Sequence, residues 1–201
     1  MEIKHVFTTV IATDILTLDN TALALHCKAA VDAHAKLPIN DVVFRKNQSA
    51  FLELSDPVLL PLVSQVTDRL NAVYNTLGFK KNTRLKILRA WANTNNTYAI
   101  DAPHSHPISF FTGVYYVNGA GTTDHGNLNL ISPVAALPHC IDKEMVETHN
   151  QFNSWEWETP PVTGGLVLFP SWILPNVSRN YLEEDRISIA FDAIIVTENF
   201  N

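Results

Sequence analysis

Residues 84–92, RLKILRAWA, mark the point at which the sequence changes from a helical pattern to a strand pattern. Polar and apolar side chains alternate here, and a period of two places every second side chain on the same face of a strand. This change of period predicts a mainly helical N-terminal part and a β-rich remainder. The residues that alternation assigns to one face of the strand are Leu85, Ile87, Arg89 and Trp91.

Downstream of this strand, short apolar segments are separated by turns rich in Gly, Asn, Asp and Pro. No helical pattern lies between them, and a succession of short strands is typical of an antiparallel sandwich or barrel. We therefore expect a β core in this half of the chain. The further strands predicted are 109–117, 127–132, 154–158, 166–170 and 186–196.

Upstream of the strand, residues 3–12 are rich in β-branched side chains and are predicted to form an opening strand. Asp19 is predicted to cap a helix that runs from Asn20 to Lys36. A second helix is predicted to start at Pro57 and to end at Gly78. The residues thus predict an α+β, mainly β fold, in which two or more N-terminal helices pack on a β-sandwich or jelly roll.

The composition limits the class of protein. A chain of 201 residues, 46% of them hydrophobic, is long enough for one domain with a buried core, and we expect a single domain over 1–201. Its parts are 1–83, with the opening strand and helices, and 84–201, with the β core. A net charge of −6 disfavours non-specific nucleic-acid binding. Because no signal peptide and no apolar run of about 18 residues is found, we expect a cytoplasmic protein without membrane contact.

Two histidines, His104 and His106, lie between prolines just before the strand predicted at 109–117. Imidazole is a good ligand for iron, zinc and copper, and two histidines at the mouth of a strand can converge on one metal ion. The alternative is an exposed loop that contains two histidines without a function. The residues alone leave both interpretations open.

The last predicted strand contains the stretch RISIAFD, residues 186–192. Alternation places Arg186, Ser188, Ala190 and Asp192 on one face of it. If that face lines a pocket, Arg186 and Ser188 form a two-pronged clamp, because the guanidinium matches a carboxylate and the hydroxyl adds a hydrogen bond. If the face meets water, both residues are merely solvated.

Taken together, these segments resemble, in order and spacing, a family of 2-oxoglutarate/iron(II)-dependent oxygenases that is found in bacteria and in phages of marine cyanobacteria. The resemblance covers the whole chain. It implies a double-stranded β-helix, a jelly roll whose open end holds iron between two histidines and one carboxylate. The segments that carry it are His-x-His-Pro at 104–107, TGVYYV at 112–117, GNLNL at 126–130, GLVLFPSW at 165–172 and RISIAFD at 186–192.

The resemblance also implies roles for individual residues. Arg186 with Ser188 matches the residues that hold the distal carboxylate of 2-oxoglutarate. His104 and His106 match the first iron-ligand position, which one or both of them occupy.

Two positions depart from the family pattern. Ser132 stands where relatives have Asp, and Pro175 stands where relatives have His. Because proline has no donor atom and serine is a poor ligand, we expect a weak or vestigial iron site. A replacement site at Asp124, His125 and His106 is conceivable, although solvated loop residues are the better expectation.

Two functions follow from the resemblance. The first is a non-catalytic scaffold or assembly protein with protein partners, in a homo-oligomer or as a tail, neck or capsid-associated component of a phage virion. It would need no cofactor and would lie in the host-cell cytoplasm or the virion. The alternative is an active dioxygenase that uses Fe(II) and 2-oxoglutarate to hydroxylate an unknown substrate.

Overall fold

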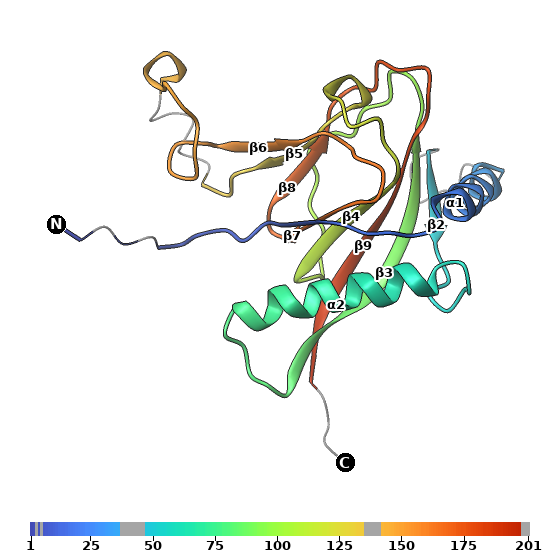
Figure 1. Cartoon of the computed structure of the whole chain (residues 1–201), viewed down its shortest axis with the longest axis horizontal. Helices are drawn as coiled ribbons and strands as arrows, with labels where there is room; N and C mark the ends of the chain where they lie inside the picture. The colour runs from blue at the N-terminus through green and yellow to red at the C-terminus, as the bar shows by residue number, and fades with distance from the viewer. Residues whose placement is uncertain (3, 5, 37–46, 135–141, 198–201) are drawn as a thin grey trace.

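The computed structural model describes residues 1–2, 4, 6–36, 47–134 and 142–197. Two sheets form its β core, a six-stranded one of order β1-β7-β4-β9-β3-β2 and a three-stranded one of order β6-β5-β8 (Figure 1). Every strand pairing described is antiparallel. The strands are β1 (Ala12–Ile15), β2 (Gln48–Phe51), β3 (Thr83–Asn95), β4 (Phe111–Asn118), β5 (Leu128–Ile131), β6 (Glu156–Thr159), β7 (Gly165–Pro170), β8 (Leu174–Val177) and β9 (Arg186–Thr197).

Two helices, α1 (Asn20–Ala35) and α2 (Leu60–Thr76), pack against the large sheet. Their apolar residues share the main core with those of β3, β4, β7 and β9. Short 3₁₀ turns occupy Thr123–His125 and Lys143–Met145. The architecture is a double-stranded β-helix with helices on its large sheet, which confirms the fold class predicted from the sequence. No helix in the described part of the chain is long and apolar enough to cross a membrane.

The structure confirms the predicted start of the first helix but not that of the second. Asp19 caps α1 as expected, because its side chain accepts a hydrogen bond from the Ala22 amide at 3.0 Å. The predicted start of the second helix at Pro57 is wrong, because α2 begins at Leu60. Asp56 instead organises a turn before the helix: its carboxylate accepts from the Val58 amide, and its carbonyl accepts from the Leu60 amide.

The first strand also differs from the prediction. Only Ala12–Ile15 form a strand, because these are the residues that find partners on β7, with Ala12 opposite Leu168 and Ile15 opposite Gly165. The described residues before Ala12 lie outside the sheet. Two short strands, β2 and β8, were not predicted at all.

A β-bulge in β3 overturns the predicted faces of that strand. Ile87 pairs with Ala193 and Arg89 pairs with Asp192, so Leu88 is an extra residue and the register shifts there. An extra residue reverses the alternation beyond it. Leu85 and Ile87 therefore share the main core with Ala90 and Ala92. Arg89, Trp91 and Asn93 lie on the opposite face, toward the small sheet.

A second, smaller core lies between the two sheets. It contains Tyr116 of β4, Leu128 and Leu130 of β5, and Val167 and Phe169 of β7. The strands of the large sheet thus bury one face against the helices and the other against the small sheet. A pocket opens beside this second core.

Close packing between β4, β7 and β9 depends on Gly113. A Cβ atom there would lie 2.6 Å from Cε2 of Phe191 and 2.7 Å from Cδ2 of Leu168. Both distances are too short for carbon atoms, so a side chain at this position requires its neighbours to move.

We predict that Gly113→Ala lowers the free energy of unfolding by about 1–3 kcal/mol, the usual cost of overpacking a core. Urea denaturation measures this change. In a Phe191→Leu background, Gly113→Ala should lower the free energy of unfolding by less than it does in the wild type, because the shorter side chain vacates the space that the methyl group needs. If Gly113→Ala lowers the free energy of unfolding equally in both backgrounds, the clash with Phe191 is not the cause.

Candidate functional site

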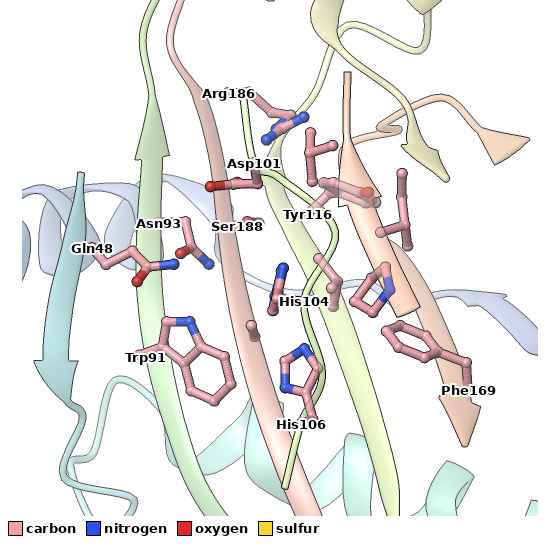
Figure 2. Close-up of a pocket in the computed structure, with 15 residues that line it drawn as sticks. Gln48, Trp91, Asn93, Asp101, His104, His106, Tyr116, Phe169, Arg186 and Ser188 are labelled. Carbon is pink, nitrogen blue, oxygen red and sulfur yellow. The ribbon is translucent and has the colours of Figure 1, made fainter. Parts of the chain in front are cut away.

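The pocket lies between the two sheets (Figure 2). The empty space within it and at its mouth is about 480 Å³, open solvent included. Its lining comes from both sheets, with residues of β2, β3, β4, β7 and β9 on one side, of β5 and β8 on the other, and of the loop before β4. The polar and aromatic residues that line it include Gln48, Trp91, Asn93, Asp101, His104, His106, Tyr116, Arg186 and Ser188.

Arg186 lies at one end of this pocket, with only 2% of its surface exposed. One terminal nitrogen, Nη1, donates to the Gly126 carbonyl at 2.8 Å, whereas the buried Nε has no hydrogen-bond partner among the described residues. Burial lowers the pKa of Arg186, and the nearby Tyr116 and Asp101 oppose that shift. Arginine nevertheless stays cationic in proteins. A buried cation with an unpartnered N–H group is suited to hold an anion.

Ser188 follows two residues later on β9 and is also buried in the pocket lining. The Ile187 and Ile189 side chains point the other way, into the main core, as alternation predicts. Tyr116 of β4 completes this end of the pocket, where burial raises its pKa to about 12 against the opposing effect of Arg186. Tyr116 is therefore a neutral hydroxyl at neutral pH.

His106 belongs to a buried network around Asp192. Its Nδ1 lies 3.0 Å from Asp192 Oδ1, and Thr112 Oγ1 donates to the same oxygen at 3.1 Å. Arg89 holds the other oxygen, with Nε and Nη2 each 2.7 Å from Oδ2. The Trp91 ring stacks on the His106 ring at a centroid distance of 5.8 Å. His106 is thus fixed from two sides.

Opposing effects act on the pKa of Asp192. Burial by itself raises it, but the hydrogen bond and charge of His106 and those of Arg89 outweigh burial, so the pKa lies below its usual value. The carboxylate is therefore ionised at neutral pH. Sequence reasoning placed Asp192 on the face of Arg186 and Ser188 but gave it no partner.

His104 lies between His106 and the Arg186 end of the pocket (Figure 2). Its Nδ1 is 2.9 Å from the Ala102 carbonyl oxygen. Because a carbonyl only accepts, Nδ1 of His104 carries the proton in this hydrogen bond. The His104 amide also donates to the Pro175 carbonyl at 3.2 Å, which ties the loop to β8.

The donors present do not fit the iron centre that the fold suggests. Among the described residues, no three His, Cys, Asp or Glu side chains come together as a metal-binding group. Pro175 lines the pocket and offers no donor atom. His104 and His106 are close, with ring centroids 5.0 Å apart, but two imidazoles supply only part of the donor set of such a centre.

Ser132 lies at the end of β5, outside the pocket lining. Its hydroxyl accepts from the Val134 amide at 3.2 Å, and its own amide donates to the Trp155 carbonyl. A carboxylate at this position would sit outside the pocket that holds His104. The replacement of Asp by Ser132 therefore matters less to the site than the sequence suggested.

The replacement site at Asp124, His125 and His106 is not formed. His125 is fully buried, and its Nδ1 accepts from the Ala120 amide at 2.8 Å. Its Nε2 lies 3.0 Å from the Glu184 carbonyl. Both ring nitrogens are thus used to hold a turn.

Sequence reasoning missed several residues of this pocket. The bulge turns Trp91 and Asn93 into it, whereas the unbroken alternation gave no reason to select them. Asp101 enters through a short bridge to Val177 of β8, with hydrogen bonds in both directions between their backbones. No local sequence signal predicts such a long-range contact.

The fold is a jelly roll, and one buried arginine lines the pocket between its two sheets. The sequence profile described as "Putative 2OG-Fe(II) oxygenase" matches residues 89–192, just over half of the chain. The chain therefore belongs to this family of 2OG-Fe(II) oxygenases. No curated protein sequence matches it.

Solved structures of low sequence identity share the fold. A Pseudomonas putida prolyl-4-hydroxylase is 16% identical with a TM-score of 0.60, over 93% of this chain and 94% of that one. The α-ketoglutarate-dependent epimerase SnoN from nogalamycin biosynthesis is 10% identical with a TM-score of 0.63, over 95% and 81%. HygX from Streptomyces hygroscopicus, solved with iron bound, is 12% identical with a TM-score of 0.56, over 96% and 84%.

We predict that Asp192→Asn lowers the free energy of unfolding by about 3 kcal/mol at pH 7, because it leaves the Arg89 charge without its buried partner. The depressed pKa means that this stabilisation is complete above the unfolded pKa of about 3.9 and is lost as pH falls through the folded value. The difference in free energy of unfolding between wild type and variant should therefore become smaller below about pH 4.

Denaturant titrations between pH 3 and pH 7 measure that difference. Asp14→Asn is the matched control, because it removes the exposed pair in which Arg69 Nε lies 2.6 Å from Asp14 Oδ2. It should have a much smaller effect. If the free energy of unfolding that Asp192→Asn removes stays constant with pH, the depressed pKa of Asp192 is contradicted.

Proposed function

We propose that this chain is a non-catalytic member of its family, which does not assemble the iron centre and uses Arg186 to bind the carboxylate of a small molecule. The observation that carries the proposal is Pro175, which lines the pocket at the position where the family pattern has a histidine. Its side chain offers no donor atom to a metal ion.

The argument against iron rests on the number of donors. A non-haem Fe(II) site of this kind needs two imidazoles and one carboxylate on one face of the metal. In the family pattern, the position of Pro175 supplies one of those imidazoles. With it lost, His104 and His106 are the imidazoles that line the pocket, and no third His, Cys, Asp or Glu of the described residues joins them in a metal-binding group.

The argument for an anion rests on Arg186. Burying a cation is costly unless polar partners compensate, and the Nε of Arg186 lacks one. A carboxylate can accept from that N–H while the Ser188 hydroxyl donates a further hydrogen bond. The neutral Tyr116 beside them keeps this end of the pocket free of a competing phenolate.

An assembly role with protein partners, in a homo-oligomer or a phage virion, remains part of the proposal. Jelly rolls serve widely as viral building blocks, which supports it by analogy of fold. Mass spectrometry of purified virions tests it: the chain should be present in stoichiometric amounts, and its absence would contradict a virion role.

An active Fe(II)/2-oxoglutarate dioxygenase is the second candidate. One observation favours it: Asp101, His104 and His106 line the same pocket as Arg186 and Ser188. Those residues would have to rearrange to share a metal ion, since they do not form a metal-binding group as they stand.

The anion site has a direct test. Succinate, titrated in the presence of a metal chelator and followed by ligand-observed NMR, should bind wild-type protein with a millimolar Kd. Arg186→Gln should weaken binding at least about tenfold, and Ser188→Ala by less, because a charged hydrogen bond is worth more than a neutral one. The exposed Arg179→Gln is the control and should leave binding unchanged. Equal affinity in wild type and Arg186→Gln would contradict the site.

The lost iron position has a separate test. Pro175→His should raise affinity for Co(II), used as a spectroscopic probe for Fe(II), at least about tenfold, because it adds an imidazole beside His104. Leu174→His is the matched control, since Leu174 is the exposed neighbour of the buried Pro175. No gain from Pro175→His over Leu174→His would show that Pro175 does not occupy the missing ligand position.

A further inference from the structure

We infer that the Arg186 pocket takes a zwitterionic ligand of the α-amino-acid class, whose carboxylate binds Arg186 and Ser188 while its ammonium group meets Asp101 and Asn93. This inference rests on the proposed anion site and adds the chemistry of the group next to the anion. It depends on the Oδ1 atom of Asn93, which has no hydrogen-bond partner among the described residues, and on the negative charge of Asp101.

The donors of the site lie together. Arg186 and Ser188 are two residues apart on β9 and point into the pocket, and both are buried. The unpartnered Nε of Arg186 supplies an N–H group for a carboxylate oxygen. These groups would bind the carboxylate of the ligand.

The acceptors lie in the same lining. Asn93 of β3 is 8% exposed, and its Oδ1 has no hydrogen-bond partner among the described residues. Asp101 is also 8% exposed, and its Oδ2 accepts from Asn95 Nδ2 at 3.2 Å. Figure 2 shows Asp101 near Arg186 and Ser188, with Asn93 beside Ser188. A ligand with its own N–H donors would satisfy Asn93 and meet the negative charge of Asp101.

The charges of the pocket favour such a ligand over a dianion. Burial lowers the pKa of Arg186, and the negative charge of Asp101 is close enough to oppose that shift. The same negative charge repels a second carboxylate brought into the pocket. A ligand that carries an ammonium group next to its carboxylate matches both residues at once, and opposite charges at short range favour it.

The rest of the pocket suits a side chain. Beyond this polar end, Trp91, His106 and Phe169 line the pocket, with His104 between (Figure 2). An α-amino acid bound by its main-chain groups would direct its side chain toward these residues. The polar end thus recognises the class of ligand, and the aromatic end selects among its members.

Matched pairs of ligands test the inference on wild-type protein. L-glutamate and 2-oxoglutarate share a carbon skeleton and both carboxylates and differ in the amine and oxo groups at one carbon. L-alanine and propionate form a smaller pair. With a chelator present, calorimetry or NMR titration should show that the amine-bearing member of each pair binds at least about tenfold tighter.

Asp101→Asn removes the negative charge and keeps the size of the side chain. This variant should bind the amine-bearing ligand less than about threefold tighter than its amine-free partner, mainly because its affinity for the amino acid falls. Glu183→Gln is the control, because it makes the same change in charge at an exposed position and should leave the preference intact. Thermal melts establish that each variant folds.

The outcomes separate this inference from the proposed function. If both members of each pair bind equally and depend on Arg186, the anion site stands and the zwitterion inference is wrong. If Asp101→Asn keeps the full preference, the assignment of the ammonium partner is wrong. If no carboxylate binds at all, the anion site fails together with the inference.

Discussion

The buried carboxylate of Asp192 is the interaction on which the site depends. It joins three parts of the fold: Arg89 of β3, Thr112 of β4 and His106 of the loop between them. Because one ionised group satisfies all three, the loop cannot move without leaving a buried charge incompletely paired, which is costly. The position of His106, and with it one end of the pocket, follows from this network.

The same strand supplies the other end of the pocket. Along β9, Arg186 and Ser188 line the cavity, whereas Asp192 lies farther on beneath His106. The alternate residues of β9 are apolar and fill the main core. One strand with a strict alternation therefore fixes both the anion-binding residues and the group that holds the histidine.

Much of this could be predicted from the sequence, since local patterns carry it. The alternation in 186–192 predicted the faces of β9, and Asp19 predicted the start of α1. The family profile confirms the resemblance drawn from collinear motifs. Such features depend on neighbours within a few residues, which is why a single sequence contains them.

The features that escaped prediction depend on distant partners. The bulge at Leu88 is set by pairing with β9, and it alone turns Trp91 and Asn93 into the pocket. Ser132 occupies a position outside the pocket that the motif order could not reveal. Asp101 reaches the site through its bridge to Val177 of β8, a strand too short and too proline-interrupted to be recognised in advance.

We propose that the fold of an oxygenase persists here without its iron-dependent reaction. The most direct measurement incubates purified protein anaerobically with Fe(II) and 2-oxoglutarate, determines bound iron, then admits O₂ and quantifies succinate. The account predicts no stoichiometric iron and no succinate above that formed by Fe(II) without protein. Stoichiometric iron together with protein-dependent succinate formation would contradict it.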